Sequence, residues 1–294
     1  MFSKVVVLCL VAGALATPPV TRTREEIEAF RSYLESTQNS DGVRVMSRLA
    51  ENPEANPEEL SGKFDGDIIL DEFMMEDMVK SYAMGRNAYV YPNTKWPQNT
   101  VVWDFGDGEF NEAQKEAIWE GVRDIERHTC IKFRLREPQD SVYVRLTGDN
   151  AGCYAHVGYW QSRGVHSLNL ARNNPGTGCF RHATIVHEFL HILGFFHMQS
   201  TWNRDDYVQI VEENLQAGTE NNFYIYGQDL VNNLGLEYDY VSCMHYGPYA
   251  FSKNGAKTII ALRDHEGTMG QREYITDKDW LRLNRHYNCP GAWD

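Results

Sequence analysis

The sequence predicts an α+β domain that follows a separate N-terminal segment. Residues 87–294 contain short segments in which apolar and polar residues alternate, as in half-buried strands, between segments with the period of an amphipathic helix. All seven tryptophans and five of the six cysteines lie in this part. Residues 17–86 contain neither residue type, and they carry 15 acidic against eight basic residues. We therefore expect one folded domain of about 200 residues behind an acidic segment.

The first 16 residues have the pattern of a secretory signal peptide. Lys4 provides a basic start, an apolar run extends from Val5 to Leu15, and small residues up to Ala16 suit cleavage. The run is too short to cross a bilayer as a helix, and no other segment is long and apolar enough to do so. A buried N-terminal helix or strand is the alternative interpretation. We expect a secreted, extracellular protein with no membrane partner.

Residues 17–86 have the character of a pro-segment rather than of a self-sufficient domain. The stretch from Arg24 to Leu34 favours a short helix. Asn52-Pro53 and Asn56-Pro57 argue against long regular elements around them. We expect this segment to be separated from a mature domain at residues 87–294.

The mature part alternates between predicted strands and helices. Short apolar or alternating runs predict four strands, at 101–105, 131–135, 142–146 and 167–171. The helical period predicts three helices, at 111–128, 181–193 and 277–286. Asn111 is a suitable N-cap for the first helix. Gly194 ends the second, because glycine readily adopts the left-handed conformation at a helix C-terminus.

The overall charge argues against two classes of partner. The net charge is −13, and no long block of Lys and Arg is present. Nucleic acids and anionic lipid surfaces attract basic patches. We therefore expect no nucleic-acid partner and a monomeric protein.

The cysteine count predicts disulfides. Cys9 leaves with the signal peptide, and five cysteines remain. In an oxidising compartment this number suggests two disulfides and one free thiol. The spacing by itself leaves the pairing open.

Residues 187–197, with the sequence HEFLHILGFFH, carry the predicted chemistry. His187 and His191 lie four residues apart, so on a helix their imidazoles share one face and can hold one Zn²⁺. Glu188 is rotated from His187 by about 100°. This places its carboxylate beside the metal, where it suits a general base.

A turn after this helix completes the ligand set. Gly194 permits a sharp change of direction, so that His197 can return as a third ligand. Three neutral histidines leave zinc an open position, at which a water would be activated to attack a peptide carbonyl. Histidines packed in a core are the alternative, but every buried polar atom would then need a partner. The spacing therefore predicts a zinc-dependent hydrolase that acts on proteins or peptides.

The pattern HExxHxxGxxH resembles the metzincin zinc proteases, and Ser-Cys-Met-His-Tyr at residues 242–246 is similar to the astacin family in particular. The resemblance implies a zinc metalloendopeptidase with Glu188 as the general base. It also implies that Met244 forms an apolar floor under the histidines. Tyr246 would be a fifth zinc ligand that swings away to hydrogen-bond the oxyanion. Cys243 lies inside this turn, so we expect it to be the free thiol.

The likeness extends from residue 87 to about residue 289. Four further motifs carry it: Trp96-Pro97, Thr129-Cys130-Ile131, Met269-Gly270-Gln271-Arg272 and Tyr287 to Cys289. It implies a two-lobed metzincin fold about an active-site cleft, with a twisted sheet and two helices in the first lobe and a largely irregular second lobe. It also implies two disulfides, Cys130–Cys289 and Cys153–Cys179. An extended substrate would lie along an edge strand, which we expect at 142–146.

The N-terminal segment contains a related motif. Phe64-Asp65-Gly66-Asp67 is similar to the inhibitory Phe-x-Gly-Asp motif of the family. By that resemblance Asp67 binds the zinc and displaces the catalytic water, and Gly66 permits close approach of the backbone. A surface turn is the alternative interpretation of the tetrapeptide alone. We expect an activating protease of trypsin-like specificity to cut near Arg86.

Three positions depart from the family pattern. Met198, Thr201 and Asn203 stand where the family usually has Glu, Arg and Asp. The family's Glu connects to the buried mature N-terminus, and Met198 cannot accept a charge-assisted hydrogen bond. The mature N-terminus is therefore either anchored differently or loose. These departures are also the support for a second function, a catalytically impaired secreted zinc-binding protein that acts by binding.

Arg272 and four histidines leave their roles open. Arg272 is expected either to favour acidic residues just after the scissile bond or to form a structural ion pair. Surface or hydrogen-bonded structural roles, rather than zinc binding, are expected for His128, His156, His166 and His182.

Overall fold

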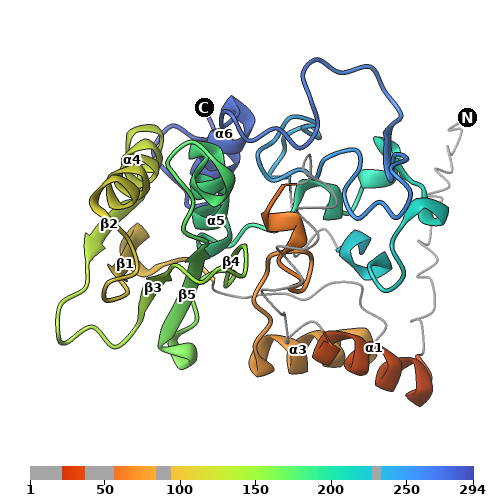
Figure 1. Ribbon diagram of the computed structural model, residues 1–294, viewed down its shortest axis with the longest axis horizontal. Helices are drawn as coiled ribbons and strands as arrows, with labels where there is room; N and C mark the ends of the chain where they lie inside the picture. Colours follow the sequence, from red (N-terminus) through yellow and green to blue (C-terminus); the bar gives the residue numbers. More distant parts are fainter. Residues whose placement is uncertain (1–21, 37–55, 84–93, 227–232) are drawn as a thin grey trace, which may run out of the picture.

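The computed structural model describes residues 22–36, 56–83, 94–226 and 233–294. The predicted signal peptide and the predicted cleavage point near Arg86 lie outside these ranges. The described part combines a sheet with several helices, which confirms the predicted α+β class. Figure 1 shows the sheet on one side of the molecule with α4 (Glu112–His128) and α5 (His182–Ile192), and long irregular connections on the other side.

A five-stranded sheet frames the first half of the C-terminal domain, in the order β2-β1-β3-β5-β4. Neighbours in this order are parallel except β4, which pairs antiparallel with β5. The strands are β1 (Thr100–Phe105), β2 (Lys132–Leu135), β3 (Tyr143–Thr147), β4 (Cys153–Ala155) and β5 (Val165–Leu170). The four predicted strands therefore exist, with ends shifted by one or two residues, and β4 was not predicted.

The predicted position of the substrate-binding edge is wrong. The segment 142–146 corresponds to β3, which pairs with β1 on one side and with β5 on the other. Val144 and Leu146 are fully buried. Their alternation with polar residues reflects one buried face, and this pattern is the same in central and edge strands. Within this sheet the edges are β2 and β4.

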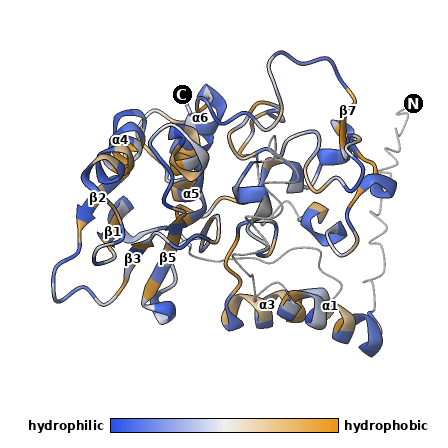
Figure 2. Ribbon diagram, viewed as in Figure 1, coloured by the Kyte–Doolittle hydropathy of each residue, from blue (hydrophilic) through white to orange (hydrophobic). Residues whose placement is uncertain are grey.

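The predicted helices form where their end signals lie. Asn111 and Gln114 make a reciprocal capping box at the start of α4. Thr276 and Asp279 do the same for α6 (Asp277–His286). Every residue of α5 after His182 is buried. Figure 2 shows hydrophilic residues on the outer side of α4, whereas its buried residues face α5.

Both implied disulfides are present. Cys130 is bonded to Cys289, which ties the end of α4 to the chain after α6. Cys153 is bonded to Cys179, which ties β4 to the turn before α5. Cys243 is the free cysteine of the described part, and it is buried as predicted.

The second half of the C-terminal domain is largely irregular. Between α5 and α6 the described residues form short 3₁₀ turns and one antiparallel pair, β6 (Val208–Ile210) with β7 (Ile259–Ala261). A separate apolar cluster holds this half together, and it includes Met198, Phe223 and Tyr246. This half therefore depends on side-chain packing and loop hydrogen bonds more than on regular elements.

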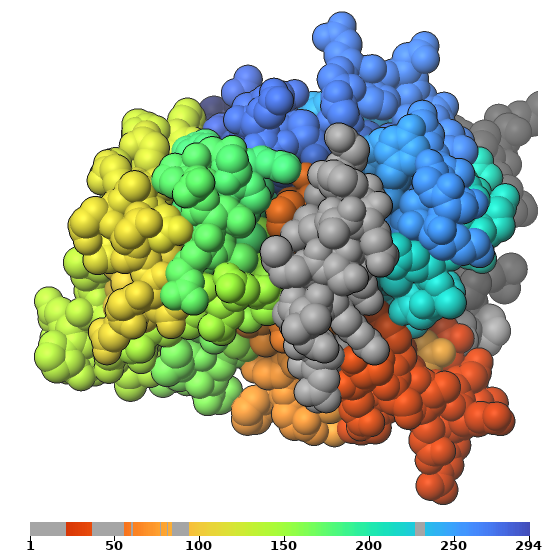
Figure 3. Space-filling model, in the orientation of Figure 1, coloured from red at the N-terminus to blue at the C-terminus, as the bar shows by residue number. Residues whose placement is uncertain are grey.

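The N-terminal segment packs against both halves. The predicted helix is α1 (Arg24–Ser36), and an unpredicted helix, α3 (Glu72–Ala83), contacts it. Arg31 and Glu76 join the two helices through an ion pair of 2.6 Å. Figure 3 shows atoms of this segment, in orange, between the green part that carries α5 and the blue part of the C-terminal half. No helix within the described ranges is long and apolar enough to span a bilayer.

Candidate metal centre

Helix α5 and the turn after it bring three histidines together. His187 and His191 lie one turn apart on α5 and are fully buried. Gly194 has a φ of +102°, the region that favours glycine, and it reverses the chain. A side chain at this position would also approach Thr94 Oγ1 to 3.3 Å. The turn returns His197 to the same point, as the spacing predicts.

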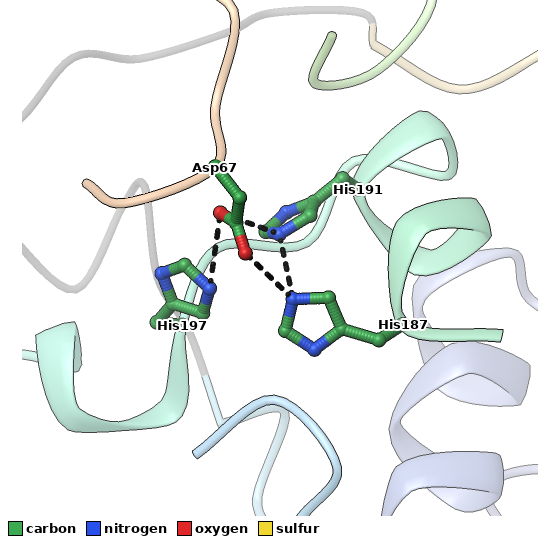
Figure 4. A group of neighbouring side chains, drawn as sticks. All are labelled: Asp67, His187, His191 and His197. Atoms are coloured by element: carbon green, nitrogen blue, oxygen red, sulfur yellow. Dashed lines mark hydrogen bonds and ion pairs between the residues drawn. The ribbon is translucent and has the colours of Figure 1, made fainter. Parts of the chain in front are cut away.

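Asp67 of the N-terminal segment completes a group of four (Figure 4). One ligand atom from each of Asp67, His187, His191 and His197 lies within 4.8 Å of all the others. Asp67 Oδ2 is 3.0 Å from His187 Nε2, and Asp67 Oδ1 is 3.2 Å from His191 Nε2 and 3.3 Å from His197 Nε2. Burial opposes ionisation of Asp67, but the positive charges of His197 and His191 outweigh it and lower its pKa well below the ordinary value.

The hydrogen bonds of two histidines fix which ring nitrogen faces inward as an acceptor. His187 Nδ1 lies 2.7 Å from the Cys243 carbonyl oxygen, and His191 Nδ1 lies 2.7 Å from the Phe195 carbonyl oxygen. A carbonyl only accepts, so each Nδ1 must carry the proton and each neutral Nε2 presents a lone pair. These two Nε2 atoms are only 3.1 Å apart. Two facing acceptors at this distance require a cation between them.

The donor set suits zinc. Three imidazole nitrogens and one carboxylate oxygen are ligands that Zn²⁺ accepts in tetrahedral sites. His197 Nε2 and Asp67 Oδ1 are buried and make no hydrogen bond within the described residues, so a metal would satisfy both atoms. The backbone carbonyls on His187 and His191 supply the outer hydrogen bonds that orient zinc-bound histidines.

Glu188 lies in the same buried region. Both of its carboxylate oxygens lack a hydrogen-bond partner among the described residues. Burial, with the carboxylates of Asp67 and Glu58, raises the pKa of Glu188 well above its ordinary value. A buried carboxyl group without a protein partner is placed to exchange a proton with a bound reactant.

The turn at residues 242–246 is held from below by α6. Asp279 accepts hydrogen bonds from Ser242 Oγ at 2.5 Å and from the Cys243 backbone N–H at 3.0 Å. Cys243 in turn offers its carbonyl to His187. The sequence analysis missed Asp279, although the Thr276-x-x-Asp279 capping pattern marks it. Met244 is 3% exposed and belongs to the main apolar cluster, as an apolar floor requires.

Tyr246 is engaged by the N-terminal segment. Its hydroxyl donates a hydrogen bond of 2.6 Å to the Asp65 carbonyl oxygen, and its ring centroid is 4.6 Å from that of His197. The Asp65 carboxylate also lies 3.2 Å from His197 Nδ1. Gly66 has a φ of +83°, and a side chain there would come within 2.8 Å of the Tyr246 hydroxyl. The motif therefore needs glycine here, and Asp65 is a second contact that was not predicted.

Arg272 forms a buried ion pair with Glu58 of the N-terminal segment. Arg272 Nη1 also donates to the His245 carbonyl oxygen at 3.1 Å. The neighbouring Glu59 accepts a hydrogen bond of 3.0 Å from the Gly247 backbone N–H. Two carboxylates of the N-terminal segment thus occupy the chain on either side of Tyr246.

The four other predicted histidines have structural partners. His156 accepts from the Ser167 backbone N–H, and His166 accepts from that of Trp160. His182 lies 2.8 Å from Asp124, and His128 stacks on Trp280. None of the four belongs to the group that could hold the metal.

Met198 is buried against the second half of the domain. It is 3% exposed, and its backbone N–H donates to the Met244 carbonyl oxygen at 2.8 Å. Thr201 Oγ1 donates to Asn233, which in turn bonds Asn203. The three departures from the family pattern thus have neutral surroundings, and residues 84–93, whose anchoring they concern, lie outside the described part.

Comparison with known proteins places this arrangement among zinc peptidases. The family model described as "Astacin (Peptidase family M12A)" matches residues 88–288. Zinc metalloproteinase nas-4 of Caenorhabditis elegans is 34% identical over 228 residues, which are 78% of this chain and 70% of the relative. Seminal metalloprotease 1 of Drosophila melanogaster is 35% identical over 250 residues, which are 84% of this chain and 93% of the relative.

A solved structure agrees with the sequence match. High choriolytic enzyme 1, a hatching enzyme zinc-protease from Oryzias latipes (medaka fish), superimposes with a TM-score of 0.59 and 30% identity. The superposition covers 67% of this chain and 94% of the hatching enzyme. Other curated relatives are longer, and the chain spans 51%, 44% and 32% of three of them.

Proposed function

Because the chain belongs to the astacin family of zinc metalloendopeptidases, we propose that it is a secreted zymogen in which Asp67 blocks the zinc site. The observation that carries this proposal is the position of the Asp67 carboxylate among His187, His191 and His197. A zinc ligand contributed by a separate N-terminal segment occupies the place that a substrate water needs. Two disulfides and the signal-like first 16 residues support an extracellular location.

We propose the following roles for the processed enzyme. Bound zinc would act as the Lewis acid that activates a water and polarises the scissile carbonyl. Glu188 would accept the proton of that water and deliver it to the leaving amine. Tyr246, once released by Asp65, would be free to serve as a fifth zinc ligand and then to donate its hydroxyl to the oxyanion. Met244 would keep the floor of the site apolar.

The edge strand β4 is proposed to bind substrate backbone. Ala155 exchanges hydrogen bonds with the N-terminal segment: its N–H donates to Asp67 O at 2.9 Å, and its carbonyl accepts from Ile69 N–H at 2.8 Å. These groups would be freed when the segment leaves. An extended peptide could then add to the same edge, with its scissile bond beside the histidines.

We expect proteolysis to depend on the metal. The processed protein should contain one zinc per chain, measured by elemental analysis, and should digest a casein-type substrate. A chelator should remove both the zinc and the activity, because His187, His191 and His197 offer no other electrophile, and added zinc should restore them. A processed protein that keeps its zinc yet cleaves nothing would instead support a protein that acts by binding.

Arg272 is proposed to recognise an acidic residue just after the scissile bond. In the zymogen its partner is Glu58, which leaves with the N-terminal segment and exposes a buried cation in the site. Arg272→Ala should therefore lower the preference for Asp or Glu at that position about tenfold or more. Peptide-library profiling of the processed enzyme measures this preference as a ratio, so a general loss of activity does not affect it.

Arg263→Ala is the matched control, because Arg263 stacks on Tyr207 and does not contact the N-terminal segment in the contacts described. It should leave the preference unchanged. The same profile in Arg272→Ala and the unmodified enzyme would assign Arg272 to a structural role alone.

A further inference from the structure

An apolar face of the C-terminal domain is covered by the N-terminal segment. Eight buried apolar residues of that segment share one cluster with three buried residues of the C-terminal domain, Val157, Phe196 and Tyr226. Trp160 and Tyr224 are partly buried against the same cluster. We call these five residues the aromatic face. The eight from the segment are Leu34, Phe64, Ile68, Leu70, Met74, Met75, Met78 and Val79.

The aromatic face does not belong to the domain's own cores. Among the described residues, none of its five members lies in either of the other two apolar clusters. Its rings contact one another and the segment: Phe196 and Tyr226 are 5.0 Å apart between centroids, and Phe30 of α1 is 6.3 Å from Tyr224. Removal of the N-terminal segment would therefore expose contiguous apolar surface.

This face adjoins the metal centre and continues the edge strand. Val157 follows Ala155, the last residue of β4, by two positions. Phe196 directly precedes His197. A peptide that pairs with β4 and reaches the histidines must therefore extend over the aromatic face at one end.

The path of the N-terminal segment shows which end this is. A side chain at Gly152 would lie 3.1 Å from Ser61 Cβ, Ile68 pairs in parallel with Ala155, and Asp71 forms an ion pair with Arg163. The segment thus runs in the same direction as β4. A substrate paired in the antiparallel sense, the slightly more stable arrangement, runs the other way. Its residues before the scissile bond would then lie over the aromatic face.

We propose that, in the processed enzyme, the aromatic face is a subsite for a large apolar or aromatic side chain that precedes the scissile bond. The proposal rests on the proposed function, since it concerns the substrate of the same site. In the zymogen the segment fills this region with its own apolar side chains, Ile68 and Leu70 among them. Apolar rings and Val157 offer dispersion contacts and area burial but no charge to hold a polar side chain.

The test profiles cleavage of peptides that vary at each of the four positions before the scissile bond. We expect the processed enzyme to prefer Leu, Phe or Tyr over Ser or Asp about tenfold or more at one of these positions. Trp160→Ala should reduce that ratio, and it should change little the cleavage of peptides with Ala at the same position. Leu135→Ala, which alters an exposed residue on the opposite sheet edge, should behave as the unmodified enzyme.

Two outcomes would overturn this subsite. One is equal cleavage of apolar and polar variants at all four positions, which the unmodified enzyme alone can reveal. The other is an unchanged apolar preference in both Trp160→Ala and Val157→Ser. Binding of apolar peptides to the processed Glu188→Gln variant, measured by fluorescence anisotropy, separates the subsite from catalysis. Tight apolar binding without any cleavage by the unmodified enzyme would reject the proposed function and keep the subsite.

Discussion

Glu188→Gln should reduce proteolysis by the processed enzyme about 10²- to 10⁴-fold, the range in which general acid–base catalysis contributes. Gln has nearly the same shape but cannot accept and return a proton at neutral pH. The two Glu188 oxygens make no hydrogen bond to the described residues, so the substitution breaks no contact that holds the fold. The rate should be measured as kcat/KM on a fluorogenic peptide.

Zinc content separates this effect from loss of the metal. Glu188 is not in the group of four ligands, so the variant should retain one zinc per chain. Glu116→Gln, an exposed change on α4, is the control and should keep full activity. Near-normal activity of Glu188→Gln with bound zinc would remove Glu188 from the mechanism.

Asp67→Asn should make the unprocessed chain measurably active. The neutral amide keeps the size of the side chain but loses the charge that attracts the metal and the histidines. Hydrogen bonds to charged groups contribute about 1.5–3 kcal/mol, so the open, active fraction should rise about 10- to 100-fold. The measurement is peptide cleavage by the intact chain, with electrophoresis to confirm that the N-terminal segment is still attached.

Asp71→Asn is the matched control for this variant. Asp71 also belongs to the N-terminal segment and also forms an ion pair, with Arg163 at 2.6 Å, but it does not reach the zinc ligands. It should leave latency largely intact. Equal activity of the two variants would show that general loosening of the segment, and not the Asp67 ligand, controls latency.

The sequence predicts the zinc ligands well because their geometry is local. His187 and His191 are set by one helical turn, and Gly194 and His197 follow within six residues. Asp67 comes from 120 residues before His187, and its prediction required a resemblance to a known motif. Periodicity cannot connect residues so far apart.

The contacts that the sequence did not predict are long-range or very short. Asp279 and Glu58 reach the site from α6 and from the N-terminal segment, and neither has a local pattern that names its partner. β4 has three residues, which is too few to show alternation. The edge position of a strand depends on which strands pair beside it, and that depends on the whole chain.

The clamp of Asp279 on the turn at 242–246 has a consequence for biosynthesis. Ser242 and Cys243 acquire their partner only when the start of α6 has been translated. The carbonyl that fixes the His187 tautomer therefore settles late, after nearly all of the chain has left the ribosome. A nascent polypeptide would thus carry its imidazoles without a finished floor, and metal loading belongs to the period after synthesis rather than during it.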